Sequence, residues 1–226
     1  MQQTVIHAAS LIVPLIIAIV FHEVAHGWVA RALGDPTAQE QRRLTLNPLR
    51  HVDPVGTIVV PGMLALASLP TFGWAKPVPV NQRRLRNPRY GMMAVAAAGP
   101  LTNFVLAAIG AILLGLILRE GGSGAVLKFV ALNLQNFILI NIFLALFNLL
   151  PIPPFDGSHI VEGALPRRAA HAYGKLRPFG FPLLFVLLVV VPYVWPGLGI
   201  IQRFVIPPAE WAAQRYQALM FAVAGG

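Results

Sequence analysis

Charged side chains are scarce in this 226-residue chain: they make up 11% of it, and only eight of them are acidic. Hydrophobic residues account for 57%, and the mean hydropathy is +0.69. This apolar surface exceeds what the core of one soluble domain could bury. The composition therefore excludes an ordinary soluble protein and indicates an integral membrane protein.

Cysteine is absent, which excludes disulfide bonds and thiolate metal ligands. The formal net charge of +9 could suggest a protein that binds nucleic acid. However, the basic residues fall in short segments between apolar runs, where positive charge faces anionic lipid and the cytoplasm. We therefore expect the lipid bilayer, and not nucleic acid, to be the partner of these basic residues.

Apolar segments cover most of the chain. They lie at about residues 4–33, 54–70, 91–118, 127–150 and 180–201, with a weaker one at about 208–224. A membrane-spanning helix needs about 20 such residues. We therefore predict an all-α polytopic membrane protein, a bundle of about five to six transmembrane helices that forms a single domain over residues 1–226.

The first apolar segment ends in VFHEVAHGWVA, residues 20–30, which brings ionisable side chains into lipid. His22 and His26 are four residues apart and share one helical face, so both imidazoles can reach one metal ion, and Glu23 can hold a water beside it. This is the HExxH zinc pattern. Because a charge inside a membrane is costly and is normally kept for function, we predict a zinc site in the membrane, near one face.

A catalytic zinc usually takes three protein ligands, and the few acidic residues make the third easy to search for. Asp156 follows the fourth apolar segment in NLLPIPPFDG, where prolines stop the helix and Gly157 lets the backbone turn back. An ordinary Asp-Gly turn is the alternative. Glu162 is the rival donor, since a different membrane metallopeptidase, such as a prenyl-protein protease, would need a glutamate ligand.

The topology of residues 54–70 decides whether Asp156 can meet the histidines. If this segment spans the membrane, Asp156 lies on the opposite side. If it dips in and returns, as its prolines and glycines allow, the three residues meet. The positive-inside rule favours the second case, with an active site near the cytoplasmic face, because Arg119 and Lys128 then lie opposite a larger basic group. That group is Arg42, Arg43, Arg50, Lys76, Arg83, Arg84, Arg86, Arg89, Arg167, Arg168, Lys175 and Arg177.

Three motifs, HEVAH, AAAGPLTNF and FNLLPIPPFDGS, occur in this order. Together they resemble those of the site-2 protease family of intramembrane zinc metalloproteases, in particular the short bacterial and archaeal members that lack PDZ and CBS domains. The resemblance implies that His22, His26 and Asp156 bind one Zn²⁺ per chain and that Glu23 is the general base. It implies a catalytic core at about residues 4–160, followed by C-terminal helices at about 180–224.

The resemblance also implies the reaction and its setting. Zinc lowers the pKa of a water, Glu23 takes its proton, and a peptide bond within or near a transmembrane helix of a substrate protein is hydrolysed. Asn103 and Asn148 are expected to hold substrate or the developing oxyanion, with helix–helix hydrogen bonding as the alternative. We expect a multi-pass protein of the cell membrane that acts in regulated intramembrane proteolysis. The oligomeric state is not predicted.

Residues 73–80, GWAKPVPV, alternate proline with other residues, so Lys76, Val78 and Val80 share one side of an extended segment. This β-like segment, between the first helix and the GPxxN helix, could pair with an unwound substrate by strand addition. A plain loop is the alternative. A catalytically inactive membrane scaffold is the remaining rival function, and the intact Glu23 argues against it.

Overall fold

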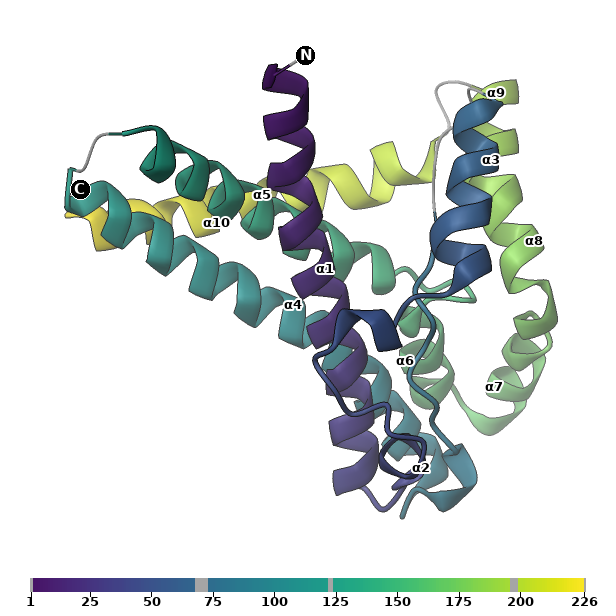
Figure 1. Ribbon diagram of the computed structural model, residues 1–226. Helices are drawn as coiled ribbons and strands as arrows, with labels where there is room; N and C mark the ends of the chain where they lie inside the picture. Colours follow the sequence, from purple (N-terminus) through teal and green to yellow (C-terminus); the bar gives the residue numbers. More distant parts are fainter. Residues whose placement is uncertain (1, 68–72, 122–123, 196–198, 226) are drawn as a thin grey trace.

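The computed structural model describes residues 2–67, 73–121, 124–195 and 199–225, and these contain helices but no β-strand (Figure 1). The α-helices are α1 (Gln2–Ala32), α2 (Thr37–Glu40), α3 (Val60–Leu66), α4 (Pro88–Arg119), α5 (Ala125–Asn148), α6 (Asp156–Ala164), α7 (Arg167–Gly174), α8 (Gly180–Phe185), α9 (Val191–Val194) and α10 (Ile206–Ala224). π-helical turns at Pro54–Val59, Val186–Val190 and Ile201–Val205 lead into α3, α9 and α10. The predicted all-α class is therefore confirmed.

Four helical stretches of the described residues are long and apolar enough to cross a membrane. They are Ala9–Ala32 in α1, Pro88–Arg119 in α4, Ala125–Asn148 in α5, and Arg167–Val194, which runs through α7, α8 and α9. Large hydrophobic side chains are exposed along these stretches, as expected for surfaces that face lipid. The predicted count of five to six spans is not confirmed. The apolar helix Pro54–Leu66 is shorter than a span, and residues 68–70 of the predicted segment lie outside the described residues.

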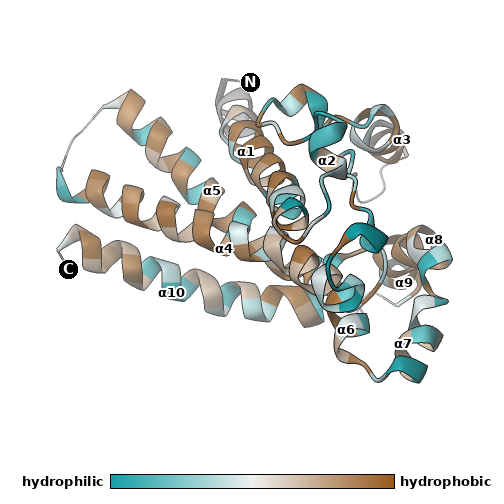
Figure 2. Ribbon diagram, turned by 90° about the horizontal axis from the view of Figure 1, so that it is seen from below, coloured by the Kyte–Doolittle hydropathy of each residue, from teal (hydrophilic) through white to brown (hydrophobic). Residues whose placement is uncertain are grey.

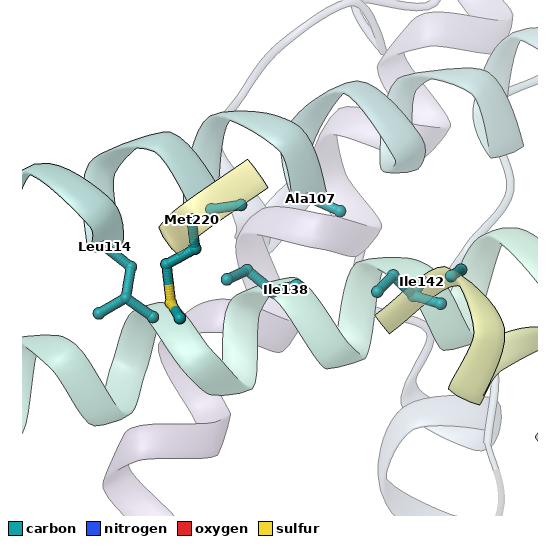
Figure 3. Close-up of a cluster of buried hydrophobic side chains, with 7 residues drawn as sticks. Ala107, Leu114, Ile138, Ile142 and Met220 are labelled. Atoms are coloured by element: carbon teal, nitrogen blue, oxygen red, sulfur yellow. The ribbon is translucent and has the colours of Figure 1, made fainter. Parts of the chain in front are cut away.

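Helix α4 is the centre of the packing and contacts α1, α5, α6 and α10. Its N-cap is Asn87, whose side chain accepts from the backbone N–H of Tyr90, and Pro88 is the first helical residue. A buried cluster joins three helices (Figure 3): Ala107, Ala111 and Leu114 of α4, Ile138 and Ile142 of α5, and Ala212 and Met220 of α10. The small α4 residues let the partner helices approach closely.

Hydrophilic residues gather around α2, α6 and α7, whereas α4, α5 and much of α10 are hydrophobic (Figure 2). The hydrophilic end contains the turn after α1, where the buried Asp35 accepts hydrogen bonds from the backbone N–H groups of Thr37 and Asn81. Asp35 therefore ties the turn after α1 to the segment before α4.

The chain between α1 and α4 makes an excursion and comes back. It leaves through Asp53, whose carboxylate accepts from the N–H groups of Val55 and Gly56, and rises into α3. On its return, the N–H of Trp74 donates to the carbonyl of Gly56 at 3.1 Å, and the N–H of Lys76 donates to that of His51 at 2.8 Å. The start and the end of the excursion therefore lie side by side.

Candidate metal centre

Two imidazoles from α1 and one carboxylate from α6 meet at a single point. His22 Nε2 and His26 Nε2 lie 3.0 Å apart, and Asp156 Oδ2 lies 3.1 Å from the first and 3.3 Å from the second. Both histidines are buried. Within the part of the chain that the structure describes, these residues form the one group of three that is able to hold a metal ion.

Asp156 reaches the histidines because the chain reverses sharply after α5. The helix ends at Asn148, the prolines of residues 151–154 prevent its continuation, and Asp156 opens α6. Gly157 packs directly on the carbonyl of Leu149, where a Cβ atom would collide with the backbone. A glycine is therefore required for α6 to fold back against the end of α5.

Hydrogen bonds define which imidazole nitrogens carry protons. His26 Nδ1 lies 2.7 Å from the carbonyl oxygen of Val95, and His22 Nδ1 lies 2.6 Å from Asn103 Oδ1. Asn103 Nδ2 donates to the carbonyl of Ala18, which fixes its Oδ1 as an acceptor. Since both partners accept, each histidine must be protonated at Nδ1, which leaves Nε2 as the nitrogen that can bind a metal ion.

These donor atoms fit a cation. The two Nε2 atoms face each other at 3.0 Å. The adjacent Asp156 Oδ2 is buried and accepts no hydrogen bond. Lone pairs arranged in this way repel one another unless a proton or a metal ion lies between them. Two imidazoles and a carboxylate are also a donor set that zinc prefers.

Gly99 leaves room for the two rings. A Cβ atom at this position would lie 2.6 Å from both His22 Nε2 and His26 Cε1, closer than atoms can pack. The imidazoles therefore lie directly on the backbone of α4. The glycine of the GPLTN motif is thus explained by packing against the metal centre.

Glu23 is half-buried, and its carboxylate is held by the chain that returns from α3. The backbone N–H of Val78 donates to Glu23 Oε2 at 2.8 Å. Within this returning chain, residues 76–81 form a short segment that we call the strap, and both of its ends are held by hydrogen bonds. The N–H of Lys76 donates to His51, and the N–H of Asn81 donates to the buried Asp35.

The structure shows hydrogen bonds that occupy several other predicted site residues. Asn103 is fully buried, and its Nδ2 donates to both Ala18 and Asn141, so it has no amide hydrogen free for an oxyanion. Asn148 Nδ2 donates to the carbonyl of Leu144 in its own helix. Among the candidate pairing residues Lys76, Val78 and Val80, the first two already use their backbone N–H groups within the chain.

Glu162, the rival third ligand, lies elsewhere. Its carboxylate pairs with the guanidinium of Arg177, which also contacts His159 Nδ1 at 3.2 Å. Burial lowers the pKa of His159, and the charge of Arg177 lowers it further. Glu162 is therefore paired with an arginine, whereas Asp156 faces two imidazoles.

Sequence reasoning missed two features of the site, namely the Val95 carbonyl that orients His26 and the amide of Asn141 that contacts Asn103. A backbone carbonyl has no signature in the sequence. Asn141 does carry a weak signal, because a polar residue in an apolar helix needs a partner.

Comparison with known proteins identifies the family of the chain. The model of peptidase family M50 matches residues 117–191. Two relatives are both named "Putative zinc metalloprotease". YwhC of Bacillus subtilis (strain 168) is 41% identical over 84% of this chain and 85% of its own length. Rip2 of Mycolicibacterium smegmatis is 27% identical over 77% of this chain and 64% of its own length. No solved structure matches.

The chain belongs to peptidase family M50, which confirms the resemblance to the site-2 proteases. It is therefore placed in a class of membrane proteins that use zinc to hydrolyse peptide bonds.

Proposed function

We infer that this intramembrane zinc metalloprotease cleaves membrane proteins within or near their transmembrane helices, with His22, His26 and Asp156 as the zinc ligands and Glu23 as the general base. The observation that carries the proposal is the convergence of two imidazole nitrogens and one carboxylate oxygen within a membrane helix bundle. Zinc at this position would supply Lewis-acid chemistry, which makes a water more acidic and polarises a substrate carbonyl.

Glu23 moves the protons of the reaction. Its carboxylate accepts a proton from the attacking water as the new C–O bond forms, and it returns that proton to the amine nitrogen as the C–N bond breaks. The Val78 N–H holds Oε2, so Oε1 is the oxygen left to take the proton. Asn148 stays our candidate for contact with the substrate or the oxyanion.

We propose that residues 54–70 form a re-entrant segment, which would place the centre near the cytoplasmic face. Two observations support this topology. The hydrogen bonds from Trp74 to Gly56 and from Lys76 to His51 join the two ends of the excursion. In addition, the basic residues of the turns on either side of it would then share the cytoplasmic side.

Cysteine labelling tests this topology, because the chain contains no cysteine of its own. Single cysteines at the exposed positions Gln41 and Arg83 should react with a membrane-impermeant reagent from the same side, and a cysteine at Glu120 from the other side. If Gln41 and Arg83 react from opposite sides, residues 54–70 span the membrane and the re-entrant proposal is wrong.

The position of the cleaved bond tests the proposed activity. A substrate helix must unwind before attack, and each backbone group freed in lipid is costly. We expect a reporter helix with Gly-Pro near its cytoplasmic end to be cut faster than one with Leu-Leu there. Gly-Pro at the outer end of the reporter helix should not increase the cleavage rate. Cleavage is measured with the purified protein in liposomes, with and without a zinc chelator.

Equal rates for all reporters would contradict the proposed depth and the unwinding step. Chelator-insensitive cleavage would contradict zinc-dependent proteolysis at this centre.

A further inference from the structure

We propose that Asn141 of α5 is a positioning residue for the zinc centre: acting through Asn103, it keeps His22 in the one tautomer that can bind metal. The inference rests on the proposed function, since it concerns the same site. Neither the HExxH motif nor the Asp156 motif contains Asn141, which lies on a different helix from the zinc ligands.

Three side chains form a continuous hydrogen-bonded chain across α5, α4 and α1. Asn141 Nδ2 donates to the carbonyl of Phe137 at 2.8 Å, and Asn141 Oδ1 accepts from Asn103 Nδ2 at 2.7 Å. Asn103 Oδ1 in turn accepts from His22 Nδ1 at 2.6 Å. Both asparagines have 0% exposure, so water cannot replace any of these partners.

The chain of hydrogen bonds has a fixed direction because backbone carbonyls anchor it. The Phe137 carbonyl only accepts, so the Asn141 amide must point its nitrogen there and its oxygen toward Asn103. Asn103 must then present its nitrogen to Asn141, and the Ala18 carbonyl demands the same orientation. Its oxygen is left for His22, which must carry its proton on Nδ1.

The direction of these hydrogen bonds determines whether His22 can bind zinc through Nε2. A neutral histidine with the proton on Nδ1 has a lone pair on Nε2, the atom that faces His26 and Asp156. If the Asn103 amide turned over, its nitrogen would face His22 Nδ1 and favour the tautomer protonated at Nε2, which cannot bind metal there. Partners that fix the tautomer of a zinc histidine are typically worth about 10–100-fold in metal affinity.

Asn141→Leu removes one of the two acceptors of the Asn103 amide group and leaves the Ala18 carbonyl as the other. We expect its zinc Kd, measured by chelator competition on the purified full chain, to rise about tenfold. Asn141→Asp should remain close to wild type. When protonated in this buried position, aspartic acid can donate to Phe137 and still accept from Asn103.

Two variants in the same helix separate positioning from general helix packing. Asn136 also links α5 to α1, through Ser10, but has no described contact with the centre. Among the partners described, Asn133 bonds only to Phe129 of its own helix. Asn136→Leu and Asn133→Leu should both keep the wild-type zinc Kd. If Asn136→Leu raised the zinc Kd as much as Asn141→Leu does, the inference would be wrong. An unchanged zinc Kd in Asn141→Leu would also overturn it.

A measurement on the unmutated chain keeps the inference testable if Asn141→Leu fails to fold. Nitrogen NMR of the zinc-loaded protein, labelled with ¹⁵N-histidine, should show His22 protonated at Nδ1 and bound through Nε2. Binding through Nδ1 would overturn the inference. These outcomes differ from failure of the proposed function, in which the wild-type chain itself would bind no zinc.

Discussion

Glu23→Gln is expected to abolish most cleavage and to leave zinc binding intact. The glutamine amide oxygen can still accept from the Val78 N–H, so the local structure should survive, but an amide cannot take a proton from water. General base catalysis typically contributes about 10²–10⁴-fold, which sets the expected loss of activity. The measurement is the cleavage rate of a reporter helix in liposomes, together with the zinc content of the same samples.

The Val78 N–H gives this prediction an internal control. Val78→Pro removes the donor that holds Glu23 and should slow cleavage without loss of zinc, whereas Val78→Ala keeps the N–H and should be close to wild type. Near-normal activity in Glu23→Gln would show that another group takes the proton. Loss of zinc from Glu23→Gln would show that this carboxylate is a ligand.

Asp156→Ala is expected to have the largest effect on metal binding. The variant removes one of three donor atoms and leaves the two bare imidazole nitrogens without a carboxylate. Zinc affinity should fall by more than the roughly 10–100-fold that supporting residues contribute, and activity should fall with it. Chelator competition gives the affinity.

Glu162→Ala is the matched control, because Glu162 pairs with Arg177 and makes no described contact with the centre. It should bind zinc as the wild type does. If Glu162→Ala lost the metal and Asp156→Ala kept it, the alternative metallopeptidase arrangement would replace the one proposed.

Much of the centre could be predicted from the sequence because its geometry is local. The spacing of His22 and His26 fixes their common face, and the proline-rich turn with Gly157 explains how Asp156 can come back toward the bundle. The structure brings these three residues together as expected, and their binding of zinc stays a prediction. The zinc metalloprotease class is confirmed by family membership.

The functions of the asparagines could not be predicted in the same way. Which atom of Asn103 faces His22 depends on Asn141 and on the Ala18 carbonyl, which belong to two other helices. Similarly, the Val78 N–H that holds Glu23 is a backbone group, and the side chain at that position gives no sign of it. Such contacts depend on how the helices pack, and composition or spacing does not determine that packing.

The number of membrane-spanning helices could also not be predicted from the sequence. Hydropathy identifies apolar length, but residues 206–224 form a helix that packs along α4 and α5, and residues 54–66 form a helix shorter than a bilayer. Among the described residues, neither segment has the combined length and hydropathy expected of a membrane span. An apolar segment therefore indicates burial or lipid contact, and the packing decides which.

X-ray absorption spectroscopy of the zinc-loaded, purified chain identifies the atoms bound to the metal and so tests the proposed zinc centre. We expect one zinc per chain with two imidazole nitrogens at about 2.0–2.1 Å and a carboxylate oxygen at about 2.0–2.2 Å. In His26→Ala, any zinc that remains should have lost one imidazole. A wild-type spectrum without imidazole ligands, or one that His26→Ala leaves unchanged, would contradict a zinc centre at His22, His26 and Asp156.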